Sequence, residues 1–219
     1  MEASNFAKTL DFVQSEIHSI LLKSRGFSKK GRTHNRKAAG GIIHAINFQM
    51  GQHPIGENYV VPGLRENLYG LFTINLGAFL PCVYEVEQQK PSPAFVQEPY
   101  CSIRSRLGQL ASGKDQWFNL GADPDELTEQ VMKLLHQFGL PFLDIFNSYE
   151  AVLTYYDENG KLPGCPSPRS ALVAAIIANQ TGNTETARAL LTKAKSGAIK
   201  PFREHVAKIA GRIGLELPE

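Results

Sequence analysis

Two arginines in the segment GFSKKGRTHNRK, residues 26 to 37, have the spacing of an anion-binding pair. Arg32 and Arg36 are four residues apart, so an extended strand places both guanidinium groups on one face. Each guanidinium can bind a carboxylate or a phosphate through two parallel N–H donors, and together the pair would form a fork for such a group. The same arginines can instead pair with the acidic middle of the chain near Glu85 and Glu87, with the neighbouring lysines left in solvent.

Polar side chains alternate with apolar ones in two later segments, IIHAINFQM and LFTINLGAF. Alternate residues of a strand point to opposite faces of its sheet, so one face of each segment is apolar and the other is polar. The polar set consists of Asn47, Gln49, Thr73 and Asn75. If the two strands are neighbours, these side chains form an amide-rich patch that can bind a peptide backbone, a base edge or another amide. The alternative is an ordinary half-solvated antiparallel sheet whose polar residues face water.

The sequence has none of the common short catalytic motifs: no GxSxG, no GxxxxGK[ST] and no GxGxxG after a strand. Its six histidines show no metal-ligand spacing such as HExxH. We therefore predict no catalytic residue, no metal and no cofactor. His44 lies on an apolar strand face and is expected to be a core histidine. Glu85 and Glu87 would share one face of a strand, where they would form a charged edge or an acid–base pair.

The three cysteines are widely spaced and include no CxxC pair, which disfavours a disulfide framework and a structural zinc site. No positively charged start leads into an apolar run, so we expect no signal peptide. The longest strongly apolar run, ALVAAIIA, is too short to span a bilayer. These features predict a cytoplasmic protein with no membrane partner.

The amino-terminal part reads as one helix followed by strands. Apolar residues at helical spacing predict a helix over about residues 4–23, and Gly26 can end it. Strands are expected at 33–37, at 42–50 and at 70–80, with a loop over 51–69. The segments VYEVEQ, SIRSRLGQL and QWFNLG are read as further strands, and Trp117 is expected to pack into the core between sheet and helices.

From Asp123 onward the pattern is helical, with helices expected over 124–138, 142–157, 167–181, 184–197 and 201–214. The fold class is therefore α+β: an antiparallel sheet of four to five strands with helices on one face, plus a carboxy-terminal helical hairpin and one further helix. We expect two domains, an α+β core over residues 1–145 and a helical extension over residues 146–219. The small residues of the hairpin suit the close packing of a single tetratricopeptide-style helix pair.

Charge is unevenly distributed along the chain. Residues 1–37 carry a net charge of +5, residues 38–187 a net charge of −7, and residues 188–219 a net charge of +4. The basic ends either pack beside the acidic middle or form a surface for an anionic partner. The overall net charge of +2 is low for a dedicated nucleic-acid binder.

The order of a helix, GFSKKGRTHNR, INFQ, FTINLG and a tryptophan segment QWFNL followed by helices resembles the family catalogued as domain of unknown function 4304. The resemblance covers roughly residues 6–145, and GFSKKGRTHNR and FTINLG are its most specific pieces. His34 stands where the family pattern leads us to expect an aromatic residue such as phenylalanine. The resemblance implies bacterial, cytosolic proteins of α+β type and supplies no activity. The motif positions that it carries over are Arg32, Arg36, Asn47, Gln49 and Asn75.

We therefore expect a non-enzymatic binding protein that engages a protein or peptide partner. The expected binding residues are Arg32, Arg36, Asn47, Gln49, Thr73 and Asn75. One alternative is a nucleic-acid-associated protein that uses the basic stretch 29–37 and the basic carboxy-terminal helices. Another is an enzyme acting on an anionic small molecule, for which the sequence offers no nucleophile or base.

Overall fold

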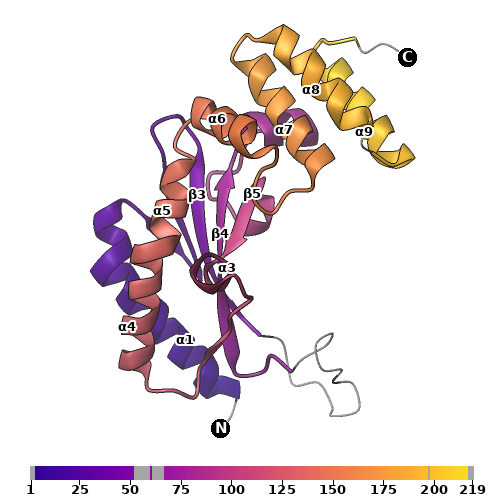
Figure 1. Ribbon diagram of the computed structural model, residues 1–219. Helices are drawn as coiled ribbons and strands as arrows, with labels where there is room; N and C mark the ends of the chain where they lie inside the picture. Colours follow the sequence, from indigo (N-terminus) through magenta and orange to yellow (C-terminus); the bar gives the residue numbers. More distant parts are fainter. Residues whose placement is uncertain (1–2, 52–59, 61–66, 197, 217–219) are drawn as a thin grey trace. The chain divides into compact units, whose positions relative to one another are not determined.

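The computed structural model describes residues 3–51, 60, 67–196 and 198–216, and the chain divides into two compact units (Figure 1). Unit 1 comprises Met1–Arg36, Ala45–Leu76 and Ser105–Phe142. Unit 2 comprises Lys37–His44, Gly77–Arg104 and Leu143–Glu219. The helices that follow residue 146 therefore group with two earlier segments of the chain.

One antiparallel sheet supplies strands to both units, in the order β1-β2-β3-β4-β5, with β6 also paired to β4. Its strands are β1 (Ser28–Lys30), β2 (Thr33–Lys37), β3 (Ile43–Met50), β4 (Leu71–Phe79), β5 (Ile103–Arg106) and β6 (Phe118–Asn119). The α+β fold class is confirmed, and so are the strands predicted at 33–37, 42–50 and 70–80. The predicted loop over 51–69 falls largely outside the described residues.

Two helices of unit 1 cover the apolar face of its part of the sheet (Figure 1). They are α1 (Ala3–Ile17) and α4 (Pro124–Leu134), and each continues as a π-helical turn, η1 (His18–Leu22) or η5 (Leu135–Gly139). Asp123 caps α4 by accepting hydrogen bonds from two backbone N–H groups, which satisfies donors that the first turn leaves open. A short 3₁₀ turn, η2 (Lys23–Arg25), follows η1 and ends at Gly26, whose φ of 81° suits glycine.

The unit 1 core follows from the alternation of β3 and β4. The inward residues Ile46, Phe48, Phe72, Ile74 and Leu76 are at most 1% exposed. A Cβ placed on Gly139 would lie 3.0 Å from Leu135, 3.3 Å from Leu107 and 3.5 Å from Leu76, so glycine allows close packing of η5 on the sheet without displacing these leucine side chains. Helix α3 (Leu107–Ser112) replaces the second half of the strand predicted for SIRSRLGQL.

In unit 2, the segment that contains Glu85 and Glu87 forms a helix, α2 (Pro81–Gln88), so the predicted strand and its charged edge are wrong. Pro81 lies in the first turn of α2, where proline is favoured. The pattern VYEVE that follows is too short to distinguish the period of a helix from that of a strand. Glu85 accepts a hydrogen bond from the Ser92 hydroxyl at 2.8 Å. Glu87 forms a two-pronged ion pair with Arg169.

The remaining helices of unit 2 are α5 (Leu140–Ile145), shared with unit 1, α6 (Tyr149–Asn159), α7 (Ser167–Gln180), α8 (Thr184–Ser196) and α9 (Lys200–Arg212). The helix predicted over 142–157 is split, because Ser148 accepts a hydrogen bond from the Ala151 N–H and starts α6. Helix α7 is the centre of the unit: Ser170–Ala178 are all buried, and α2, α6 and α8 pack around it. The predicted carboxy-terminal hairpin is α7 with α8.

His44 is fully buried in unit 2, and its Nε2 lies 2.9 Å from the carbonyl oxygen of Phe146, which confirms a core role. Cys82, Cys101 and Cys165 are buried free thiols, and burial raises the pKa of each. Among the described residues, no helix combines the length and apolar character needed to cross a membrane.

Candidate functional site

The face of unit 1 opposite α1 and α4 carries a set of polar side chains, which we call the amide face. Its members are Asn47, Gln49, Thr73, Asn75, Arg106, Asp115 and Trp117. Its centre is Asn75 on β4, which is only 6% exposed. The Asn75 Nδ2 donates to Gln49 Oε1 at 2.7 Å, and the Asn75 Oδ1 accepts from Arg106 Nε at 3.2 Å. Because both ends of this buried amide are satisfied, the network incurs little desolvation cost and holds its neighbours in place.

Arg106 extends the network from β5 to the surface. Its NH1 donates to the carboxylate of Asp115, and its guanidinium lies over the ring of Trp117 with 5.5 Å to the centroid. The Trp117 Nε1 lies 3.4 Å from Asp115 Oδ2. The side chains of Arg106 and Asp115 are 34% and 41% exposed. Hydrogen bonds and the aromatic ring thus fix a partly exposed cation in one orientation.

Two further contacts join neighbouring elements on the same face. The Asn47 Nδ2 on β3 donates to Thr33 Oγ1 on β2 at 2.9 Å. The Thr73 Oγ1 on β4 donates to the carbonyl oxygen of Gln116 at 3.2 Å, next to the start of β6. Gln49 is exposed and Asn47 is half-buried, so part of this row is accessible to a partner.

The two arginines of the predicted fork lie elsewhere. Arg32 Nε donates to Asp11 Oδ1 on α1 at 2.8 Å, and Arg36 stacks over the ring of Phe27 at 4.8 Å. Since Thr33 contacts the amide face, the alternation of β2 turns Arg36 toward the opposite face. The structure therefore places Asn47, Gln49, Thr73 and Asn75 on one face and directs the guanidinium groups of Arg32 and Arg36 away from it, although the Asn47 Nδ2 also lies 3.5 Å from the backbone carbonyl oxygen of Arg32.

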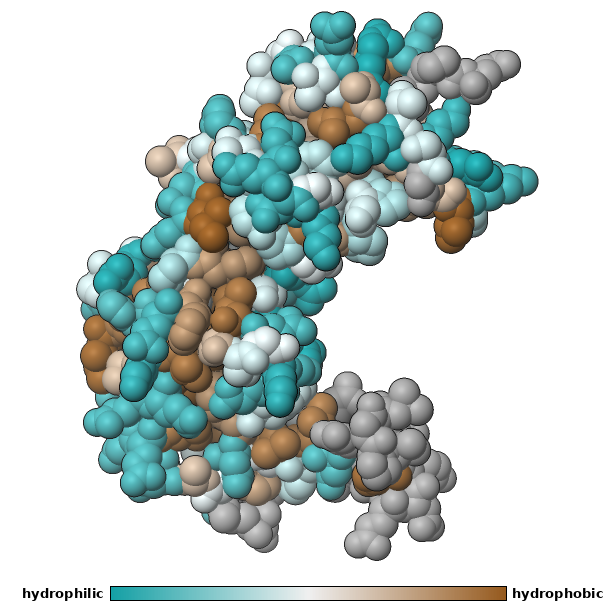
Figure 2. Space-filling view, in the orientation of Figure 1, coloured by the Kyte–Doolittle hydropathy of each residue, from teal (hydrophilic) through white to brown (hydrophobic). Residues whose placement is uncertain are grey.

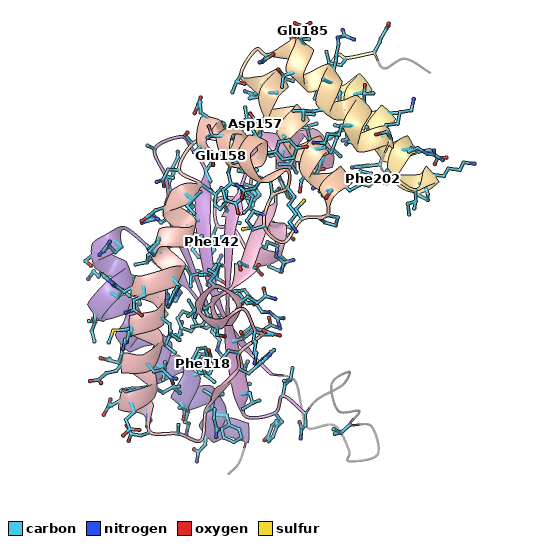
Figure 3. The ribbon with its side chains drawn as sticks, in the orientation of Figure 1. Phe118, Phe142, Asp157, Glu158, Glu185 and Phe202 are labelled. Carbon is cyan, nitrogen blue, oxygen red and sulfur yellow. The ribbon has the colours of Figure 1, made fainter. Side chains whose placement is uncertain are left out.

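Residue-level reasoning missed three members of the network: Arg106, Asp115 and Trp117. The expectation that Trp117 packs into the core was wrong, because the ring is half-buried on the amide face beside Arg106. One signal was present, since the segment IRSR alternates and places Arg106 on one face of a predicted strand. The next residue in the chain, Phe118, which is labelled in Figure 3, is only 2% exposed, and its ring centroid lies 5.2 Å from that of Phe72 in the core of unit 1.

Residues 19–145 match the family described as domain of unknown function 4304. This segment is more than half of the 219 residues. The chain belongs to this family. No curated protein and no solved structure matches the chain.

Every member of the amide face lies in the segment that matches domain of unknown function 4304, whereas helices α6 to α9 lie outside it. The family name supplies no activity, so the chemistry has to be argued from the side chains. Within the described part of the chain, no three His, Cys, Asp or Glu side chains gather as a metal site would require.

Beneath α1, on the other face of the same part of the sheet, lies a pair of histidines. His34 is fully buried, and its ring centroid is 5.1 Å from that of His18 and 5.5 Å from that of Phe48. Neither His34 nitrogen has a well-aligned hydrogen-bond partner among the described residues. Burial lowers the pKa of His34 to about 4, helped by the nearby charges of His18 and Lys29 and opposed by the backbone of Ile46.

Burial and the positive charges of Lys29 and Lys23 also lower the pKa of His18. Both rings are thereby favoured in their neutral, packing form. The histidine that stands at the expected aromatic position of the family therefore packs inward as an aromatic residue would.

Proposed function

We propose that this member of domain of unknown function 4304 is a non-enzymatic binding protein that engages a protein or peptide partner through the amide face. The observation that supports this most is the pre-oriented Arg106, held by Asn75 and Asp115 and stacked on Trp117. Arginine and tryptophan are enriched among the residues that dominate binding energy at protein interfaces. A side chain that is already ordered loses less entropy on binding.

The chemistry of the accessible groups suits a peptide backbone or an acidic side chain. Gln49 and Asn47 offer amide donors and acceptors, and Arg106 offers guanidinium N–H groups that Asn75 and Asp115 do not fully use. Amide groups can bind main-chain N–H and C=O groups without selecting particular side chains. The cation and the indole ring would then provide the selectivity.

A site-specific crosslink tests this proposal. A photoreactive benzoyl-phenylalanine is placed at the exposed Gln49 of the full chain, and a matched variant carries it at the exposed Gln130 on α4. In extracts of the native host, we expect one stoichiometric partner to crosslink from position 49 and not from position 130. Capture should be lost when Arg106→Ala is added to the Gln49 probe.

The single tryptophan of the chain gives an independent readout of binding. Because Trp117 is half-buried within the network, a partner that covers the amide face should change its emission. Equal crosslinking from positions 49 and 130, or a partner that leaves Trp117 emission unchanged, would contradict the proposal.

The basic stretch supports a second candidate, association with nucleic acid. Lys23, Arg25, Lys29 and Lys30 are all exposed within η2, β1 and the residues between them, although Lys29 also donates to Ser15 at 2.8 Å. A cluster of this kind attracts phosphates without reading sequence. This candidate predicts oligonucleotide binding that weakens steeply with salt and with a Lys29→Ala, Lys30→Ala variant. Binding that is absent or insensitive to salt would remove it.

A further inference from the structure

Unit 2 has a surface pocket of about 280 Å³ where the start of α7 meets the start of α9. Its lining is mainly apolar and comes from two short segments: Pro166, Pro168, Arg169, Ala198, Ile199 and Phe202. We call it the proline pocket. Figure 3 shows Phe202 in the first turn of α9. The pocket is large enough for one bulky side chain, although it is small for a drug-sized ligand.

The rim of the proline pocket exposes an unusual amount of apolar surface. Ile199 is 75% exposed, the highest exposure of the large hydrophobic residues in the described chain. Pro166 and Pro168 restrict the backbone on the opposite side, so the pocket needs little ordering before it binds. Covering Ile199 and filling the pocket would therefore be favourable, at about 25 cal/mol for each Å² of apolar surface removed from water.

Among the described lining residues Arg169 alone is charged, and it is already paired with Glu87. Its NH2 donates to Glu87 Oε2 at 2.7 Å, and its NH1 contacts the other carboxylate oxygen. His205 Nε2 also lies 3.7 Å from this carboxylate, and Arg212 NH1 donates to the Glu87 carbonyl oxygen at 2.6 Å. Arg169 therefore has little unpaired charge to offer a ligand, so any selection for charge has to come from other residues near the pocket.

The exposed residues next to Ile199 and Phe202 in the chain are mostly basic. Lys200 and Arg203 are exposed and flank Phe202 in the sequence, and Glu204 is the exposed acidic residue beside them. The first turn of α9 contains no acidic residue and has no side-chain cap at Ile199, so its positive helix end lacks a compensating carboxylate. Hydrophilic side chains cover most of α8 and α9 in Figure 2, with isolated apolar residues between them. An apolar pocket whose lining residues have exposed basic neighbours in the chain is complementary to an apolar residue flanked by acids.

We propose that the proline pocket binds an acidic peptide segment that inserts one bulky apolar side chain between Pro168, Ile199 and Phe202. The peptide's carboxylates would face Lys200 and Arg203 and the uncompensated start of α9. This surface lies outside residues 19–145 and on the other unit from the amide face, so the inference does not rest on the proposed function.

The test uses the full chain and a short fluorescein-labelled peptide with a central Leu-Phe pair flanked by glutamates. Two comparison peptides carry Ala-Ala in place of the apolar pair or lysines in place of the glutamates. We expect the first peptide to bind, the Ala-Ala peptide to bind at least about tenfold more weakly, and the lysine peptide not to bind. Fluorescence anisotropy measures each affinity.

Variants separate the two halves of the proposed contact. Ile199→Ser should weaken binding about tenfold, and Lys200→Gln with Arg203→Gln should do the same while removing its salt dependence. Both changes affect exposed side chains, so the fold should survive, which circular dichroism checks. The matched controls Ile145→Ser and Lys161→Gln change exposed residues of unit 2 that do not line the pocket and should leave binding unchanged.

Several outcomes would overturn the inference. One is that no peptide binds, and another is that the Ala-Ala peptide binds as well as the first. A third is that Ile199→Ser has no effect while a single-stranded oligonucleotide displaces the peptide, which would indicate nucleic acid. The last is that sedimentation shows the chain pairing with itself through Ile199, so that a second copy occupies the pocket.

Discussion

The buried polar side chains on the two faces of the unit 1 sheet differ in whether their polar atoms are hydrogen-bonded. On the amide face, Asn75 is nearly buried but has a partner at each end of its amide. Beneath α1, His34 is fully buried and packs through its ring, with no well-aligned partner for either nitrogen among the described residues. Both residues belong to the same sheet, Asn75 to β4 and His34 to β2 with β3 between them, so the difference arises from what lies above each face.

The comparison shows that a polar residue type does not determine its own role. Arg106 can reach Asn75 because β5 runs beside β4 and no described helix lies between the two side chains. His34 faces the apolar residues under α1, where only the neutral imidazole can be accommodated without a large desolvation cost. The first environment organises a polar surface, and the second makes stability depend on pH.

The largest effect is expected from His34, as a dependence of the free energy of unfolding on pH. The pKa of His34 is lowered from the unfolded value of 6.5 to about 4, so the unfolded chain binds its proton first as the pH falls. Stability is therefore complete above pH 6.5 and is lost as the pH falls toward 4. Between about pH 7.5 and about pH 5 the wild type should lose roughly 2 kcal/mol of unfolding free energy from this group.

His34→Phe should remove most of that loss, because phenylalanine fills the same position without a proton to bind. Urea unfolding followed by Trp117 emission at the two pH values measures the difference, and it reports on unit 1. His136→Asn changes an exposed histidine of η5 and serves as the control. An equal pH dependence in wild type and His34→Phe would show that the buried pair does not titrate as described.

A change of similar size is expected at Asn75, where the substitution should lower the free energy of unfolding. Asn75→Leu leaves Gln49 and Arg106 without their central partner and should cost about 2 kcal/mol of unfolding free energy. Gln130→Leu on the exposed side of α4 should stay within about 0.5 kcal/mol of wild type. If Asn75→Leu were as stable as the control, the hydrogen bonds of Asn75 would contribute nothing to stability. The proposed difference between the two faces of the sheet would then be wrong.

The smallest effect on stability is expected at the ion pair between Arg32 and Asp11. The side chains of Arg32 and Asp11 are 29% and 55% exposed, so their ion pair is largely screened by water. A double-mutant cycle with Arg32→Ala and Asp11→Ala should give a coupling of about 0.5 kcal/mol that decreases with salt. A coupling free energy larger than the roughly 2 kcal/mol expected for Asn75→Leu would contradict this order of effects.

Much of the fold follows from local pattern. The alternation in INFQM and FTINLG predicted β3 and β4 because both strands are amphipathic, and Asp123 with Pro124 marked the start of α4. Local pattern failed at VYEVEQ, where an alternating run of fewer than two helical turns fits either period. The split between α5 and α6 was missed because the cap at Ser148 interrupts a continuous helical pattern.

The candidate site was predictable only in part. The alternation of β3 and β4 placed Asn47, Gln49, Thr73 and Asn75 on one face, which their hydrogen bonds in the structure agree with. Arg106 is distant in sequence from Gln49, and its contact with Asn75 requires that β5 pair with β4. The sequence does not state which strand pairs with which, so Arg106 could not be assigned to the patch.

By itself, the sequence determined the fold class, the family resemblance, two central strands and the face on which four polar residues lie. These depend on side-chain period and on turn and cap residues, which act over a few neighbouring positions. Only the tertiary structure decided that Arg32 pairs with Asp11, that Arg106 and Trp117 join the amides, and that His34 is buried against His18. Each of those outcomes depends on strand order and helix packing, which bring together side chains far apart in the chain.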